Sequence, residues 1–162
     1  MATGKSTVGQ AIGEATGWPV VDNDALLERT TGCTAVRMLE RDGLEALRSA
    51  ESDVLTLVLS LPGPLVSGVA AGVVLAEPDR VRLRAGGHVV YLRTPVPMLV
   101  RRLSPLDHRP FLQGDPVGAL TAMSAARDPL YLEVAHQVID MAVLTPRQAA
   151  RDVLAVLDGL RD

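Results

Sequence analysis

The sequence predicts an α/β fold, in which helices cover both faces of a parallel sheet to give three layers. Short apolar runs alternate along the chain with longer stretches of helical periodicity, which is typical of βαβ units. The hydrophobic fraction is 48% and aromatic residues make up only 2%, so we expect an aliphatic core. With 162 residues and no repeat or linker, the chain is expected to form one domain over residues 1–162.

The first expected element is a helix over residues 5–16, ended by Gly17. Its inner side carries apolar residues at helical spacing, namely Val8, Ala11, Ile12 and Ala15. Later strands are expected where short apolar runs lie next to Gly or Pro, and Gly43 is expected to form a turn inside one long helix. In order, these elements are a strand at 18–22, helices at 23–31 and 34–60, a strand at 65–67, a helix at 77–85, a strand at 88–92, helices at 95–103, 117–126 and 129–136, a strand at 137–140 and a helix at 146–160.

Composition excludes several classes of protein. A net charge of −3 argues against a nucleic-acid binder that relies on a general positive field. The apolar stretch 54–75 is interrupted by Pro62, Gly63 and Pro64, so we expect no membrane span. The single cysteine, Cys33, forms no internal disulfide and is expected to be a small buried hydrophobe. We therefore expect a cytoplasmic protein. We also expect a monomer, although the sequence does not determine the oligomeric state.

The only lysine among the 16 lysines and arginines is Lys5, in the run Gly4-Lys5-Ser6-Thr7. A phosphate-binding loop needs a compact point charge, which the planar arginine fork does not supply. The run matches the end of the Walker A pattern G-x-x-x-x-G-K-[ST]. Met1 stands at the third position of that pattern, so the first glycine and the preceding strand are missing.

Four further motifs follow in order, and together the five resemble the shikimate kinase family of P-loop kinases. They are Val21-Asp22-Asn23-Asp24, Leu47-Arg48-Ser49-Ala50-Glu51, Arg109-Pro110-Phe111-Leu112 and Arg127-Asp128-Pro129-Leu130-Tyr131. The resemblance implies transfer of the γ-phosphoryl group of ATP to the 3-hydroxyl of shikimate, a step of aromatic amino-acid biosynthesis. It also implies a lid at about residues 104–116 and Mg²⁺ as the metal.

The expected nucleotide site begins at the helix N-terminus, where backbone amides form an anion cradle. Ser6 would ligate Mg²⁺ and Asp22 would hold its waters. The residues expected to contact ATP are Ala2, Thr3, Gly4, Lys5, Ser6, Thr7, Arg109 and Pro146.

The expected acceptor site uses Asp24, Arg48, Ala70 and Arg127. Asp22 and Asp24 are two residues apart, so on an extended segment both carboxylates would face one cleft. Asp24 would accept the hydrogen bond of the substrate hydroxyl, with Lys5 and Arg109 completing the catalytic set. The alternative for Asp24 is a helix N-cap. Arg48, oriented by Glu51 three residues later, and Arg127 would bind the carboxylate and hydroxyl groups.

Three departures from the family pattern affect these expectations. The family places its first strand at the sheet centre, and that strand is missing here. Two neighbouring strands would then keep unpaired edges around an open slot. We therefore expect translation to start upstream of Met1. Where the family has three glycines, this chain has Val69-Ala70-Ala71, so we expect crowding, and strain wherever φ is positive. The family arginine near the adenine aligns with Val143 or Leu144.

Two alternatives to the shikimate kinase interpretation stay open. They are a related kinase with a different acceptor and a degenerate nucleotide-binding paralogue.

Overall fold

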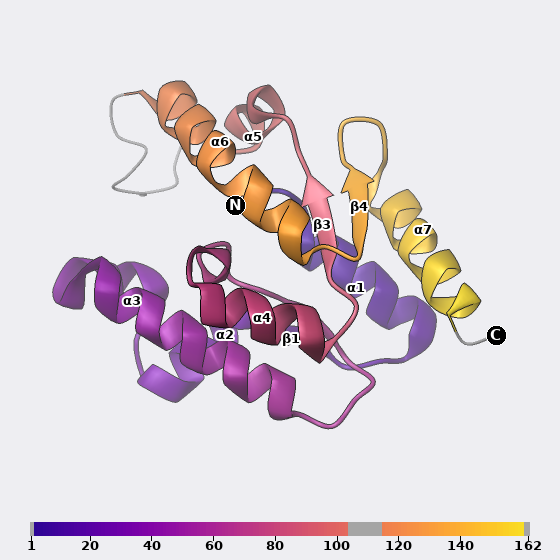
Figure 1. The fold of residues 1–162 in the computed structure, drawn as a ribbon, viewed down its shortest axis with the longest axis horizontal. Coiled ribbons are helices and arrows are strands. Elements are labelled where there is room, and N and C mark those ends of the chain that lie inside the picture. The colour runs from indigo at the N-terminus through magenta and orange to yellow at the C-terminus, as the bar shows by residue number, and fades with distance from the viewer. Residues whose placement is uncertain (1, 104–114, 161–162) are drawn as a thin grey trace.

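The computed structural model describes residues 2–103 and 115–160 and has the predicted α/β architecture (Figure 1). Most expected elements form within two residues of their expected bounds. In chain order they are α1 (Lys5–Thr16), β1 (Val20–Asp22), α2 (Asn23–Thr31), α3 (Ala35–Ser60), β2 (Val66–Gly68), the 3-10 turn η1 (Val73–Leu75), α4 (Glu77–Gly86), β3 (Val90–Arg93), α5 (Val96–Arg102), α6 (Pro116–Val134), β4 (Gln137–Asp140) and α7 (Pro146–Gly159).

The described strands form two parallel pairs rather than one sheet. β1 pairs with β2, with Val20 opposite Val66, and β3 pairs with β4, with Val90 opposite Gln137. Figure 1 shows β3 and β4 side by side, pointing the same way. No described strand lies between β2 and β3.

Glycine lets α1 approach the first strand pair closely. Gly9 and Gly13 are buried, and a side chain at Gly13 would overlap Val20. The expectation that Ala15 faces inward is wrong, because Ala15 is exposed and the glycines occupy the inner face. The other side of α1 packs on α7 and β4 in an aliphatic cluster that includes Val8, Ile12, Ile139, Met141, Ala149 and Val153.

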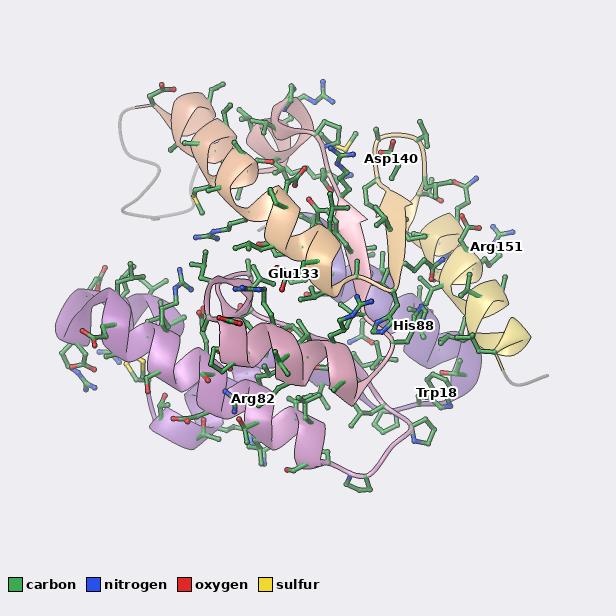
Figure 2. All side chains as sticks on the ribbon, in the orientation of Figure 1. Trp18, Arg82, His88, Glu133, Asp140 and Arg151 are labelled. Carbon is green, nitrogen blue, oxygen red and sulfur yellow. The ribbon has the colours of Figure 1, made fainter. Side chains whose placement is uncertain are left out.

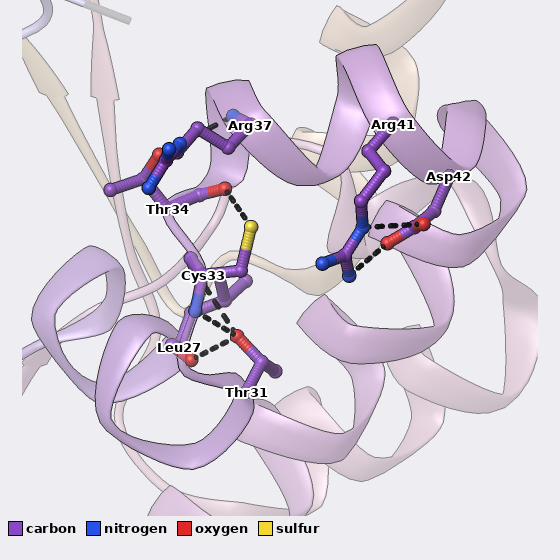
Figure 3. A network of polar contacts seen from close by, with 7 residues as sticks. All are labelled: Leu27, Thr31, Cys33, Thr34, Arg37, Arg41 and Asp42. Atoms are coloured by element: carbon purple, nitrogen blue, oxygen red, sulfur yellow. Dashed lines mark hydrogen bonds and ion pairs between the residues drawn. The ribbon is translucent and has the colours of Figure 1, made fainter.

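The second aliphatic cluster joins α2 to α3. Cys33 is buried there, 7% exposed, as predicted. Figure 3 shows the turn between the helices, where the Thr31 hydroxyl lies 2.7 Å from the Leu27 carbonyl and accepts a hydrogen bond from the Cys33 amide at 3.2 Å. Thr34 then caps α3 by accepting from the Arg37 amide.

Two helices differ from the simplest interpretation of the sequence. α3 changes direction at Gly43, whose φ is 86°, as the expected turn there requires. The separate helices expected at 117–126 and 129–136 are one continuous helix, α6, with Pro129 inside it. Proline removes one backbone donor, and the packing of α6 on η1, α4 and α5 holds the helix through that break. Over the described ranges, no helix is both long and apolar enough to cross a bilayer.

Candidate active site

The phosphate-loop residues lead directly into α1. Gly4, the N-cap, is left-handed with φ 95°, and neither a capping side chain nor an acidic residue occupies the first turn. This helix start is therefore suited to an anion. Thr3 and Lys5 are half-buried and line one cavity with Arg127 and Tyr131.

Ala2 supplies two features that the sequence did not reveal. Its φ is 52°, and it is the one non-glycine residue with positive φ among those described, a conformation that disfavours side chains. Its carbonyl oxygen accepts a hydrogen bond from Arg102 Nη1 at 3.1 Å. The end of α5 thus holds the start of the phosphate loop.

The two expected carboxylates lie on different elements. Asp22 ends β1 and caps α2, accepting from the Ala25 amide at 2.9 Å, so the N-cap is Asp22 and not Asp24. Asp24 is in the first turn of α2. The argument that both extend from one strand is wrong, because the helix begins at Asn23.

A buried carboxyl group, that of Glu51, pairs with Arg48, and its pKa also responds to the charges of Arg127 and Asp24. Glu51 is 8% exposed and accepts a hydrogen bond from Arg48 Nη1, which confirms the expected i, i+3 contact. Burial raises the pKa of Glu51, and the charges of Arg48 and then Arg127 oppose that rise while Asp24 adds to it. The three predicted acceptor-site residues therefore lie within electrostatic reach of one group.

Gly72 is required by this arrangement, and sequence reasoning gave it no role. A Cβ atom at Gly72 would overlap the Arg48 guanidinium and approach Glu51 Oε2 to 2.6 Å. The guanidinium therefore lies directly over the Gly72 backbone. The signal in the sequence was its position as the glycine retained after Val69-Ala70-Ala71.

The strain considered for that turn does not occur. None of Val69, Ala70 and Ala71 has a positive φ, so L-residues fit the backbone. Ala70 is half-buried, packs against a core cluster that contains Leu55, and lines the cavity. Ala70 therefore contacts the core and also faces the cavity.

Tyr131 fastens the turn to α6, another contact that the sequence did not predict. Its hydroxyl donates to the Ala71 carbonyl at 2.9 Å. Burial raises the pKa of Tyr131, and Arg127 is the first of the charges that oppose the rise. Its ring stacks on Tyr91 with centroids 4.9 Å apart, and Tyr91 in turn donates to Asp128. The motif around Arg127 therefore braces the acceptor side.

The structure gives fewer contacts for the remaining predicted residues. Pro146 begins α7 behind the N-cap Thr145, at the carboxyl end of β4, and is half-buried. Arg109 and most of the expected lid lie outside the described residues. His88 and His136 stack with ring centroids 5.6 Å apart. The described part of the chain holds no group of three or more His, Cys, Asp or Glu that could bind a metal.

Comparison with known proteins identifies the family. The family model described as "Shikimate kinase" matches residues 1–158. The chain belongs to the shikimate kinase family. A shikimate kinase of Oleidesulfovibrio alaskensis is 38% identical over 86% of this chain and 83% of its own. One from Pseudomonas entomophila is 34% identical over 99% of this chain and 93% of its own.

Solved shikimate kinase structures share the fold. The structure of the Acinetobacter baumannii shikimate kinase in complex with shikimate has a TM-score of 0.90 and 34% identity, covering 98% of this chain and 89% of that one. The Bacteroides thetaiotaomicron shikimate kinase has a TM-score of 0.83 at 21% identity, covering 100% and 94%. The expected fold class and the expected enzyme class, a shikimate kinase transferase, are confirmed.

Proposed function

We propose that this chain transfers the γ-phosphoryl group of ATP to the 3-hydroxyl of shikimate in aromatic amino-acid biosynthesis. The observation that carries the proposal is the position of Arg48, which the Glu51 carboxylate holds over the Gly72 backbone. Arg127 lines one cavity with the phosphate-loop residue Lys5. An acceptor bound by Arg48 and Arg127 would lie near the phosphate held by Lys5.

The acceptor side binds through charge and shape. Two guanidinium groups, Arg48 and Arg127, match a carboxylate and its neighbouring hydroxyl, because each presents planar paired donors. Glu51 and the Gly72 backbone fix the position of Arg48. Asp24 accepts the hydrogen bond of the reacting hydroxyl and takes up its proton as the phosphoryl group moves.

The donor side uses the start of α1. Backbone amides and Lys5 hold the phosphates, and Arg109 neutralises charge on the transferring group. The exposed Ser6 hydroxyl and the exposed Asp22 carboxylate are hard oxygen ligands that suit Mg²⁺, directly and through water. The metal would supply charge neutralisation at the phosphates. Pro146 would cover the base.

Lys5→Ala tests the donor side. We expect turnover to fall below one-thousandth of the parent value in a coupled ADP-release assay, because the point charge on the transferring phosphate is lost. The circular dichroism spectrum should be unchanged. Undiminished turnover would overturn the phosphate-loop assignment.

Arg48→Lys tests the acceptor side. It keeps the charge but loses the paired donors, so the KM for shikimate should rise about ten- to a hundredfold while the KM for ATP stays within about twofold. Arg37→Lys, at an exposed position of the same helix, is the matched control. Equal effects of the two changes would contradict the assigned role.

A second acceptor remains a candidate because Val69-Ala70-Ala71 replaces the three glycines of the family pattern. A screen of hydroxylated carboxylic acids, with ADP release as the readout, separates the possibilities. Turnover of another acid with none of shikimate would replace the proposal, and ATP binding with no turnover of any acid would indicate a nucleotide-binding paralogue.

A further inference from the structure

Asp128, the residue after Arg127 on α6, has both carboxylate oxygens engaged by side chains of β3. Its Oδ1 accepts a hydrogen bond from the Tyr91 hydroxyl, and its Oδ2 lies 3.3 Å from Arg93 Nη2 in an ion pair. Tyr91 and Arg93 are two residues apart on β3, so their side chains point to the same face of the strand. One carboxylate on α6 therefore joins the helix to two positions of one strand.

This contact lies next to a break in the backbone hydrogen bonding of α6. Pro129 has no backbone N–H, so the α-helical hydrogen bond to the Ala125 carbonyl cannot form. Arg127 and Asp128 come immediately before the proline. The side-chain contacts of Asp128 therefore restrain a part of α6 that has one fewer backbone hydrogen bond than the rest of the helix.

Tyr91 contacts α6 on the far side of the proline as well. Its ring stacks on that of Tyr131, with centroids 4.9 Å apart, and the charge of Arg127 reaches Tyr131 closely enough to oppose the rise in its pKa. Burial raises the pKa of Tyr91, and the hydrogen bond to Asp128 raises it further. The Tyr91 hydroxyl therefore stays protonated near neutral pH and keeps its role as donor.

Arg127 and Asp128 both line the cavity. A free carboxylate at this position would compete with the carboxylate of an acceptor for the Arg127 guanidinium. Because Tyr91 and Arg93 engage both oxygens of Asp128, its negative charge is directed to β3 and the guanidinium remains available to a ligand.

We propose that Asp128 is a positioning residue, which directs the Arg127 guanidinium towards the acceptor by fixing α6 to β3. The inference rests on the proposed function, in which Arg127 binds the acceptor. The role of Asp128 is indirect, because it acts through the direction and the availability of the Arg127 side chain.

The Nε–H signal of Arg127 tests the proposal in the full chain without any substrate. It is assigned in proton–nitrogen NMR spectra by its loss in Arg127→Lys. We expect Asp128→Ala and Tyr91→Phe each to shift this signal and to speed its hydrogen exchange by about fivefold or more. Glu133→Ala should leave the signal unchanged. It is the matched control, because Glu133 lies in the last turn of the same helix (Figure 2) and pairs with Arg80 of α4 at 2.9 Å.

Steady-state kinetics measures the consequence for the acceptor. Asp128→Ala should raise the KM for shikimate about five- to twentyfold and leave the KM for ATP within about twofold. Asp128→Asn should recover most of this loss, because its amide oxygen still accepts from Tyr91. Adding Tyr91→Phe to Asp128→Ala should change the KM by less than about twofold, since both substitutions remove the same contact. Glu133→Ala should leave both KM values within about twofold.

Two results would overturn the proposal. The first is an Arg127 signal in Asp128→Ala that matches the parent in position and exchange rate. The second is an equal rise of the two KM values in Asp128→Ala, or an equal effect of Glu133→Ala, which would indicate a general loss of stability. A parent protein that does not turn over shikimate would contradict the proposed function instead, and an altered Arg127 signal would then still support the positioning role.

Discussion

Arg48 is held from two sides, by the Glu51 carboxylate and by the Gly72 backbone, and each contact can be removed by one substitution. Gly72→Ala places a methyl group where the guanidinium lies, so Arg48 must move. We expect the KM for shikimate to rise about ten- to a hundredfold, with the KM for ATP nearly unchanged. Steady-state kinetics with each substrate varied gives both values.

The control for that change lies in the same turn. A Cβ atom at Gly68 would meet no heavy atom within 4 Å, apart from its chain neighbours, so Gly68→Ala should leave both constants within about twofold. If Gly68→Ala raised the KM for shikimate as much as Gly72→Ala, the loss would reflect backbone freedom rather than displacement of Arg48.

Glu51 gives a prediction on pH. Burial raises the pKa of Glu51 above its ordinary 4.5, so the folded state favours the protonated form. Its contribution to stability is fully present below about pH 4.5 and is lost as pH rises through the raised value. The free energy of unfolding of the parent, minus that of Glu51→Gln, should therefore decrease with pH over this window.

Urea denaturation of both proteins at several pH values from 4 to 7 measures that difference. Asp53→Gln, an exposed substitution on the same helix, provides the reference for the loss of one carboxylate from that helix. A difference for Glu51 that increased with pH would mean that the ion pair with Arg48 outweighs burial.

At the scale of elements, a side chain from another helix caps the C-terminal end of α6. Arg84 of α4 donates from Nη1 to the Glu133 carbonyl at 2.8 Å and lies 3.4 Å from the Ala135 carbonyl. The Glu133 carbonyl is in the last turn of α6 and the Ala135 carbonyl is at its C-cap, where carbonyls lack helical partners. Arg84→Met should therefore lower the free energy of unfolding by about 1 kcal/mol.

Thermal or urea unfolding checks this value, with Arg101→Met, an exposed arginine in the last turn of α5, as the control. An equal loss in both variants would indicate a general effect of charge rather than capping of α6.

Helix bounds could be predicted where residues close in the sequence determine them. α1 and α7 begin and end at Gly or Pro signals that act within one turn, so their bounds were predictable. α6 was not, because Pro129 predicts a break and only the packing of α6 on η1, α4 and α5 preserves the helix. The cap at Asp22 rather than Asp24 depended on where β1 stops, which is equally non-local.

The residues of the proposed acceptor site also differ in whether their contacts are local in the sequence. The i, i+3 pair of Arg48 and Glu51 was predicted from the sequence and formed as expected. Gly72 and Tyr131 were missed because their contacts join turns and helices far apart in the sequence. No local pattern reports which backbone a side chain will cover.

At the scale of the whole molecule, the phosphate loop is tied to a residue 100 positions later. Arg102 donates to the Ala2 carbonyl at 3.1 Å, so the end of α5 positions the loop. Arg102→Met should raise the KM for ATP about three- to tenfold and leave the KM for shikimate within about twofold. Arg101→Met is the neighbouring control, and equal effects would argue against this contact.

The residues of the proposed acceptor site are divided between the two strand pairs. Asp24 and Arg48 belong to elements around β1 and β2, whereas Arg127 and Tyr131 belong to α6, just before β4. Between the pairs, the described chain has helix packing but no strand hydrogen bonds. A carboxylate bound by both Arg48 and Arg127 would contact elements of both strand pairs. Acceptor binding would then help to fix the position of one pair relative to the other.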